Sequence, residues 1–404
     1  MAPKLSSRDR MLAAIGCDVP DYVPCSFMLF AALRKRCADE FEFVRKQLDL
    51  GLDAFVRMPV RLTQASRAES EHQDLYGLPV RFDPRVEVKN WREEPAGSRY
   101  PVIHREYVTP AGVLRTAVNQ TDDWPHGARV PLFDDYIVPR AQKHLITDPE
   151  DLPALRYLLT PPTDEDIAAF REQAQVTKAF AAKHNLLVVG EWGVLFDAAC
   201  WLCGIQDLML MAAMTPPFVR DLLTIIYEWN RRRMDVVLEA GVDLLVRRAW
   251  YETVDFLSPP TYRQLILPLL TEDAQQAHQA GTRLALITTA AYTPLLDMYL
   301  ESGIDVLIGL DPVQDARADF ALTKRKLAGR VCLWGGVNGF VTVETGTPAQ
   351  VRGAVRAAIR QLGPGGGFIL SPIDNVTADS PDVWANVSAL VDEWRACREY
   401  PIQT

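Results

Sequence analysis

The sequence "RLALITTAAYTPLLDMYLESGIDVLIGLD", residues 283–311, contains a complete strand–helix–strand pattern. It begins with an apolar, partly β-branched run and closes with a second apolar run, "DVLIGLD". Between them, "TPLLDMYLESG" has helical spacing, begins beside Pro294 and ends at Gly303, which can cap the C-terminus of a helix. The stretch therefore predicts one repeat of a parallel α/β fold.

Apolar runs of the same kind recur along the chain. Several are continuously apolar rather than alternating, as expected for parallel strands that helices cover on both faces. Eight strands with helices between most of them fit a closed (β/α)8 TIM barrel better than an open sheet, so we predict an α/β fold of that type. The eight predicted strands are 23–29, 53–59, 185–193, 242–250, 283–290, 305–311, 331–338 and 366–375.

One interval, about 60–184, interrupts this repeat. The segments "VEVKNW", "YPVIHREYVTP" and "VLRTAVNQT", with Pro-Ala-Gly turn signals at 95–97 and 110–112, predict antiparallel β-hairpins. We interpret the interval as an insertion after the second strand that covers the mouth of the barrel, within a single domain spanning residues 1–404.

Composition limits the classes of function. The 404 residues carry a formal net charge of −9 and a pI near 5.3, which argues against nucleic acid as a general partner. The chain has no run of 18 apolar residues and no secretory signal pattern, so we expect no membrane span. Seven scattered cysteines do not form a disulfide framework and indicate a cytoplasmic location. Nothing decides between a monomer and a homodimer.

The C-terminal ends of the predicted strands hold the candidate site residues, because barrel enzymes place their chemistry there. Glu191, Glu252 and Asp374 are the candidate catalytic acids or, alternatively, the ligands of an oxygen-rich metal site. Equally, one of these carboxylates could simply pair with a strand-end arginine. Candidate substrate-binding residues, which would form an apolar pocket with polar anchors, are Phe27, Arg57, Trp192, Arg247, Trp250, Asn338 and Asn375.

Two other motifs have structural interpretations that we favour. Cys200 and Cys203 form a "CWLC" pair at the spacing of a zinc or redox site, but they lie in a predicted helix without a second pair, which indicates a buried structural pair. The "GPGGGF" segment at 363–368 precedes a strand instead of opening a helix, so it predicts an αβ turn and not a phosphate loop.

Taken in order, these segments resemble the uroporphyrinogen decarboxylase superfamily, which includes cobalamin-dependent methyltransferases. The resemblance is scattered over nearly the whole chain. It is strongest in "GVDLLVRRAWYETVDFLSPPTYRQLILPLL" (241–270), "WGGVNGF" (334–340), "GPGGGFILSP" (363–372) and "REYPI" (398–402), and the opening "RMLAAIGCDVPDYVP" (10–24) matches the family's first helix and strand.

The resemblance disfavours ordinary porphyrinogen decarboxylation. In the decarboxylase branch, arginines after "FM" on the first strand grip the substrate carboxylates. Here "FMLFAALRKR" places Leu29 and Phe30 where the first arginine and its neighbour would be expected, and whether Arg34 substitutes for the second arginine is left open. Losing a bidentate clamp is costly for a substrate with eight carboxylates.

The methyltransferase branch is the nearer one, but its usual zinc motif is missing. That branch implies a His-x-Cys zinc motif at the end of the fifth strand and a third ligand after the eighth. Ile287 and Thr289 stand at the first two positions and Asp374 at the third, so thiol activation is disfavoured and bound zinc is uncertain.

The favoured interpretation is an enzyme that moves a methyl group from a small donor, such as a methoxylated aromatic compound, to a corrinoid (cobalamin) carried by a partner protein. A leaving oxygen would then need a Lewis acid or a proton donor. One alternative is a decarboxylase or lyase acting on a small carboxylic acid or porphyrinogen-like substrate, anchored by Arg57, Arg247 or Arg248. A second alternative is a non-catalytic binding barrel.

Overall fold

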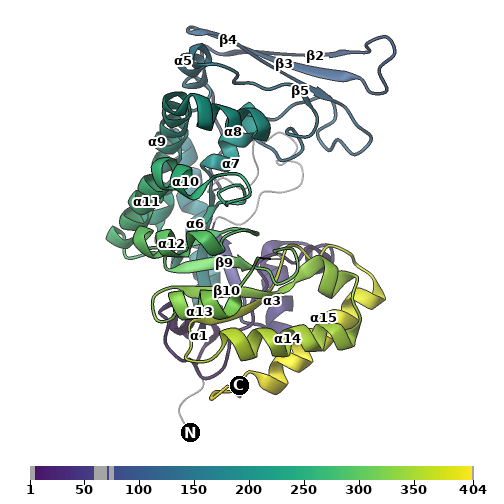
Figure 1. Cartoon of the computed structure of the whole chain (residues 1–404), viewed down its shortest axis with the longest axis vertical. Helices are drawn as coiled ribbons and strands as arrows, with labels where there is room; N and C mark the ends of the chain where they lie inside the picture. Colours follow the sequence, from purple (N-terminus) through teal and green to yellow (C-terminus); the bar gives the residue numbers. More distant parts are fainter. Residues whose placement is uncertain (1–4, 59–70, 72–76, 316, 403–404) are drawn as a thin grey trace. The chain divides into compact units, whose positions relative to one another are not determined.

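A computed structural model describes residues 5–58, 71, 77–315 and 317–402. The chain divides into two compact units, shown in Figure 1. The first unit comprises residues 1–60, 173–191 and 240–404, and the second comprises 61–172 and 192–239. The assignment of both units to a single domain stays a prediction.

A curled parallel sheet forms the centre of the first unit. Its seven strands follow the order β1-β6-β7-β8-β9-β10-β11, and the paired strands whose register is defined run parallel. Each of these strands coincides with a predicted one, which confirms the α/β class. The strands are β1 (Phe55–Met58), β6 (Leu187–Gly193, whose last two residues belong to the second unit), β7 (Leu244–Arg248), β8 (Arg283–Ile287), β9 (Val306–Leu310), β10 (Cys332–Asn338) and β11 (Phe368–Ile373).

The predicted strand at 23–29 is instead a single bridge, in which Cys25 pairs in parallel with Leu370 of β11. On the other side of this segment, the amide of Asp53 donates to the Cys25 carbonyl (2.8 Å), two residues before β1. A regular ladder fails for a physical reason. Pro24 has no amide to donate, and the Cys25 amide donates to the Asp53 carboxylate (3.3 Å). The segment nevertheless links the two edge strands of the sheet.

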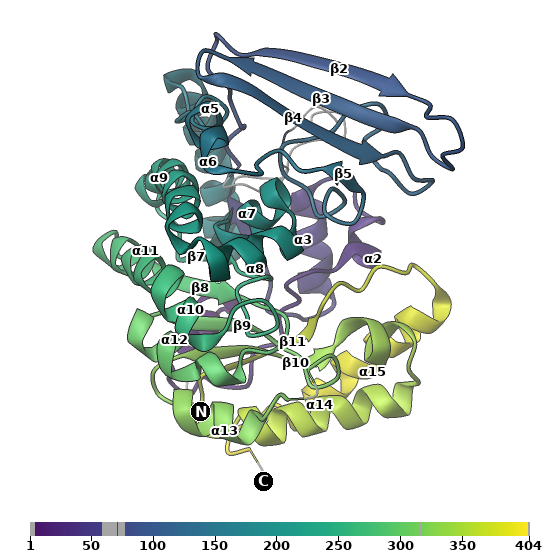
Figure 2. The same ribbon diagram turned by 45° about the horizontal axis from the view of Figure 1, so that its top comes forward.

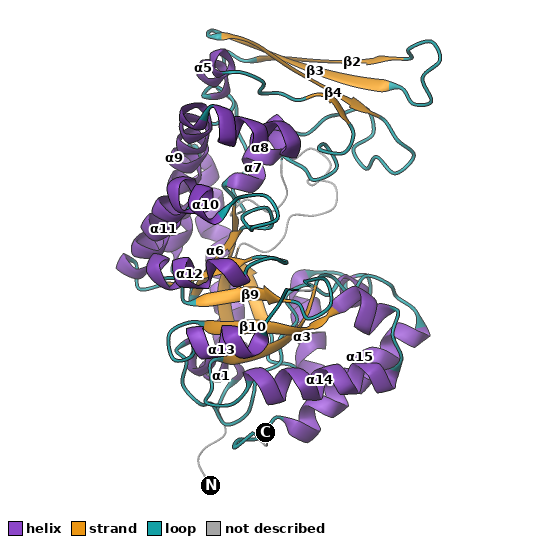
Figure 3. Cartoon of the chain, in the orientation of Figure 1, coloured by secondary structure: helices purple, strands orange, loops and turns teal. Residues whose placement is uncertain are grey.

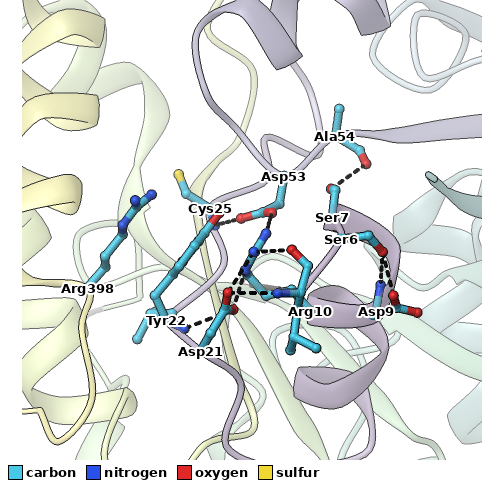
Figure 4. Close-up of polar contacts among 12 residues, drawn as sticks. Ser6, Ser7, Asp9, Arg10, Asp21, Tyr22, Cys25, Asp53, Ala54 and Arg398 are labelled. Carbon is cyan, nitrogen blue, oxygen red and sulfur yellow. Dashed lines mark hydrogen bonds and ion pairs between the residues drawn. The ribbon is translucent and has the colours of Figure 1, made fainter. Parts of the chain in front are cut away.

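A buried ionic network fixes this link, as Figure 4 shows. The Arg10 guanidinium donates to the Asp21 carboxylate (2.6 and 2.9 Å) and to the Asp53 carboxylate (2.6 Å). Arg10 and Asp53 are 3% and 1% exposed. Burial alone would lower the pKa of Arg10, but the two carboxylates raise it above its usual range. Helix α1 (Ser7–Ile15) is thereby tied to the backbone at both ends of the 21–53 segment.

Helices cover the sheet of the first unit. Among these contacts, α14 (Pro348–Leu362) packs against β10 and β11, and α11 (Leu267–Gln279) packs against β8 (Figure 2). The "GPGGGF" segment is the turn between α14 and β11, as predicted. Further described helices of this unit are α2 (Ala31–Arg34), α3 (Glu40–Asp49), α10 (Pro259–Leu265), η2 (Thr293–Leu295), α12 (Leu296–Ser302), α13 (Phe320–Leu327), the π-helix η3 (Gly339–Glu344) and α15 (Pro381–Cys397).

The second unit combines an antiparallel sheet with helices (Figure 3). Its four strands, in the order β2-β3-β4-β5, are β2 (Glu87–Glu93), β3 (Val102–Thr109), β4 (Gly112–Asn119) and β5 (Ala141–Lys143). They lie between β1 and β6 in the sequence; the role of this segment as a cover of the barrel mouth stays a prediction. The helices are η1 (Pro149–Asp151), α5 (Leu152–Leu155), α6 (Asp164–His184, which runs on into the first unit), α7 (Phe196–Cys203), α8 (Ile205–Met214) and α9 (Pro216–Ala240).

The "CWLC" pair lies in α7, where Cys200 and Cys203 are 0% and 1% exposed. Burial raises the pKa of the Cys203 thiol well above its usual range, which suppresses the reactive thiolate. No single helix among the described residues is long and apolar enough to cross a membrane, although α7 and α8, bent by 107°, meet the length and composition test as a pair.

Candidate active site

A cavity of about 250 Å³ opens at the C-terminal ends of the parallel strands in the first unit. This is the position at which barrel enzymes place their catalytic groups. Larger hollows of about 710 and 660 Å³ occur on the second unit, but no predicted site residue lines either of them. The strand-end cavity is lined by Met28, Leu29, Trp250, Ile287, Thr288, Thr289, Ile308, Gly309, Gln314, Pro372, Ile373 and Asp374.

Asp374 is the one charged residue in this lining. It follows β11 directly and has a left-handed backbone (φ 69°), a conformation that is uncommon outside glycine and is often found at functional sites. Its carboxylate accepts from the amide of Asn375 (2.8 Å) and from the Gln314 side-chain amide (3.3 Å). Both contacts use the carboxylate as an acceptor.

Gln314 owes its place to a turn after β9. The Asp311 carboxylate accepts from the amides of Val313 (2.7 Å) and Gln314 (3.0 Å) and from the side-chain amide of Asn338 (2.6 Å). Asp311 and Asn338 are both fully buried. The predicted substrate residue Asn338 therefore holds the loop that carries a cavity residue, and it does not line the cavity itself.

Close approach of β8 and β9 shapes the wall beside Thr288. Gly309 has φ 114°, and a Cβ at this position would overlap the Thr288 carbonyl oxygen. The Thr288 side chain is 1% exposed, and its hydroxyl has no hydrogen-bond partner among the described residues. A buried hydroxyl in this state is costly, so it marks a place where a ligand atom or a water can bind.

Glu252, a predicted catalytic residue, lies outside this lining. It is fully buried, and both of its carboxylate oxygens accept from Arg247 (2.9 and 2.8 Å). Arg247 also donates to Asp273 (2.9 Å), and these two carboxylates raise the pKa of Arg247 although burial opposes them. Glu252 is therefore paired with Arg247, which is the alternative of an arginine pair that the sequence analysis left open.

Three other predicted residues lie outside the lining and contact neighbouring segments. Arg57 is 5% exposed and donates to the carbonyl of Met28, which lines the cavity. Phe27 is buried and packs on Phe30, with ring centroids 4.6 Å apart. The Asn375 side chain accepts from the amide of Ala31 (2.9 Å), the first residue of α2.

Trp250 lines the cavity, and the guanidinium of Arg248 lies over its ring at 3.9 Å. Glu191 and Trp192 lie on β6. The side chain of Glu191 is outside the described part of the structure, and Trp192 is a buried residue of the second unit. The structure thus brings Trp250 and Asp374 together, with Ile287 and Thr289 beside them.

The residues at the family's zinc positions do not fit that metal. Ile287 has no donor atom, and the neutral hydroxyl of Thr289 is not a normal zinc ligand. Within the described parts of the chain, no group of three or more His, Cys, Asp and Glu residues could hold a metal ion. The thiolate-and-imidazole site of the methyltransferase branch is therefore not built here.

Gln314 and Gly309 are two of the cavity residues that the sequence analysis did not select. Gln314 stands three residues after Asp311, at a spacing typical of a turn that an aspartate caps, but the partner strand that fixes this turn is distant in sequence. Gly309 within the apolar run "DVLIGLD" is a signal of close backbone approach.

The family model described as "Uroporphyrinogen decarboxylase (URO-D)" matches residues 125–397, more than half of the chain. The chain therefore belongs to the uroporphyrinogen decarboxylase family. A search of curated proteins finds no match.

Several solved structures resemble this chain in fold. A methyltransferase from Methanosarcina mazei is 17% identical, with a TM-score of 0.59 over 97% of this chain and 99% of that chain. A B12-independent methionine synthase from Shewanella sp. W3-18-1 (12% identical, 56% and 65% covered) and a 3-keto-D-glucoside 4-epimerase from E. coli (14%, 67% and 97%) have TM-scores of only 0.39 and 0.34 and carry no argument.

Proposed function

We propose that this chain is a methyltransferase that passes a methyl group from a small donor in the strand-end cavity to a corrinoid carried by a partner protein. The family, which includes corrinoid-dependent methyltransferases, and the fold shared with the Methanosarcina mazei protein support the proposal. The observation that carries it is the cavity itself. Its described lining has apolar walls, one carboxylate and a hydroxyl without a described hydrogen-bond partner, at the strand ends where barrel enzymes act.

The volume of the cavity indicates that it can hold the methyl donor but not the corrinoid acceptor. About 250 Å³ is below the roughly 300–1,000 Å³ of sites for drug-sized ligands, so a donor of a few heavy atoms fits and a tetrapyrrole does not. A corrinoid would therefore stay on its partner protein, where it supplies the nucleophile that accepts the methyl group. The chain's own residues bind the donor, orient its methyl group and exclude water.

The charge of the lining disfavours the decarboxylase alternative. A small carboxylic acid needs a cationic anchor, and the described lining residues include no Lys, Arg or His. Of the three proposed anchors, Arg57 donates to the Met28 carbonyl and Arg247 to the Glu252 and Asp273 carboxylates. The third, Arg248, lies over the Trp250 ring and is not part of the described lining. A non-catalytic barrel would give no reason for one cavity to hold both the uncommon backbone of Asp374 and the buried Thr288 hydroxyl, which has no partner among the described residues.

The test is methyl transfer. The purified chain is mixed with cob(I)alamin, free or on a corrinoid-binding protein, and with a panel of small methyl donors that includes methoxylated arenes, methylated amines and choline. A donor-dependent change from the cob(I)alamin to the methylcobalamin spectrum supports the proposal. A panel in which every donor leaves the spectrum unchanged, with a corrinoid protein shown to accept methyl from a chemical methyl donor, would overturn it.

A further inference from the structure

The formal charges of the residues that line the cavity indicate the chemical class of the methyl donor. Among its twelve lining residues, Asp374 supplies the only formal charge. Its carboxylate forms no ion pair with any residue that the structure describes, and its two hydrogen bonds come from neutral amides. The cavity therefore presents a negative charge that no cation among its described lining residues balances.

Such a cavity discriminates by charge. A carboxylate at an apolar wall attracts a cation, repels an anion and gives a neutral ether no comparable gain. The indole of Trp250 adds an aromatic surface, of which Arg248 already lies over one face. Of these two charged residues, Asp374 lines the cavity and Arg248 does not.

The chemistry of the leaving group agrees with this charge. A methyl ether expels an alkoxide or phenoxide, which needs a proton donor or a Lewis acid. The residues at the zinc positions do not build such an acid, and the Asp374 carboxylate acts as an acceptor in both of its contacts. A methyl group on a quaternary nitrogen needs neither, because a neutral tertiary amine leaves.

We propose that the methyl donor is a quaternary ammonium compound whose cationic head lies beside Asp374; this inference rests on the proposed methyl transfer. The C–N bond breaks with its electron pair staying on nitrogen. The methyl carbon bonds to the cobalt(I) of the partner's corrinoid, which supplies the new electron pair and ends as cobalt(III). No proton moves. The Thr288 hydroxyl is placed to bond a second polar group of the donor.

The test compares choline with 3,3-dimethylbutan-1-ol, in which a neutral carbon replaces the ammonium nitrogen. We expect calorimetric titration of the full chain to give choline about two- to fivefold tighter binding, because Asp374 is an exposed residue and solvent screens its contact with a cation. Asp374→Asn should bring the ratio close to one, because it removes the charge and asparagine tolerates the left-handed backbone. Asp392→Asn, which changes an exposed carboxylate on α15, should leave the ratio unchanged.

Equal binding of the two probes, or a choline preference that survives in Asp374→Asn, would overturn the inference. Because binding needs no corrinoid, the outcomes separate the two proposals. Methyl transfer from methoxyarenes without choline binding overturns the quaternary ammonium donor alone. Selective choline binding without transfer from any donor of the panel overturns the proposed function, and with it the donor role.

Discussion

Replacing Glu252 with glutamine separates a structural from a catalytic role for this residue. Glu252 and Asp273 share the Arg247 guanidinium, and the three residues are at most 4% exposed. Removing one partner of such a buried ion pair costs about 3–5 kcal/mol of unfolding free energy. We expect the cost of Glu252→Gln to be about 3 kcal/mol, the lower end of this range, because Arg247 keeps its ion pair with Asp273 and one of the two neighbouring carboxylates loses its charge. Arg247→Met should cost more than Glu252→Gln, since both carboxylates then lose their shared cation.

Urea unfolding followed by circular dichroism measures these costs. With a slope of about 3 kcal/mol per molar, a loss of about 3 kcal/mol lowers the midpoint by roughly 1 M. The matched control is Glu301→Gln, which breaks the Arg263 pair (2.8 Å); both of its side chains are about half exposed, so the cost should stay below about 1 kcal/mol. An unchanged midpoint in Glu252→Gln together with loss of methyl transfer would refute the structural role.

Two further perturbations test the cavity wall and the second unit. Gly309→Ala should lower the unfolding free energy by more than about 1 kcal/mol, because Gly309 has φ 114° and an added Cβ would overlap the Thr288 carbonyl oxygen. The control is Gly353→Ala inside α14, where an added Cβ meets open space, and it should be neutral or stabilising. Equal effects of the two substitutions would contradict this account. Burial lowers the pKa of His144 below its usual 6.5, although the negative charge of Asp207 opposes this shift. The unfolded chain therefore binds the proton at higher pH than the folded chain, and the free energy of unfolding should fall as pH drops below about 6.5. Thermal unfolding scans of His144→Leu from pH 7.5 to 5 should show a smaller fall, and an identical fall would show that other groups cause it.

The strands of the first unit could be predicted because parallel strands covered on both faces are locally apolar, and this property is visible in short windows of sequence. The segment 23–29 has the same apolar character and yet makes only one bridge. The deciding contact is the Asp53 carboxylate on the Cys25 amide, 28 residues away, and no local pattern encodes it.

The candidate site residues also fall into those that a local sequence pattern selects correctly as cavity residues and those whose place depends on distant contacts. The rule that chemistry lies at strand ends selects Trp250 and Asp374, and both line the cavity. It also selects Glu252, because a carboxylate at a strand end looks the same in sequence whether it faces a ligand or an arginine. Asp273 on α11 completes that buried cluster, and its place depends on how α11 packs against β8. Tertiary packing thus decides which strand-end charges stay available for chemistry.

The buried pair of Asp311 and Asn338 gives a direct test of how Gln314 is held. In Asn338→Asp the donor on Asp311 is lost and two carboxylates face each other across the 2.6 Å contact. We expect a loss of about 3 kcal/mol or more in unfolding free energy at pH 7, measured by urea unfolding. The paired carboxyls would share a proton in the fold, so their folded pKa rises above the unfolded value and the deficit should shrink as pH falls.

The double variant Asp311→Asn with Asn338→Asp reverses the polarity of this contact and keeps the rest. The new amide at 311 can donate to the carboxylate at 338, while its oxygen still accepts from the amides of Val313 and Gln314. The carboxylate at 338 still accepts from the Val341 amide. The double variant should therefore recover most of the lost stability, and also the cavity's affinity for choline if Gln314 is restored beside Asp374. Recovery of neither quantity would show that Asp311 and Asn338 do not act as the hydrogen-bonded pair that holds this loop.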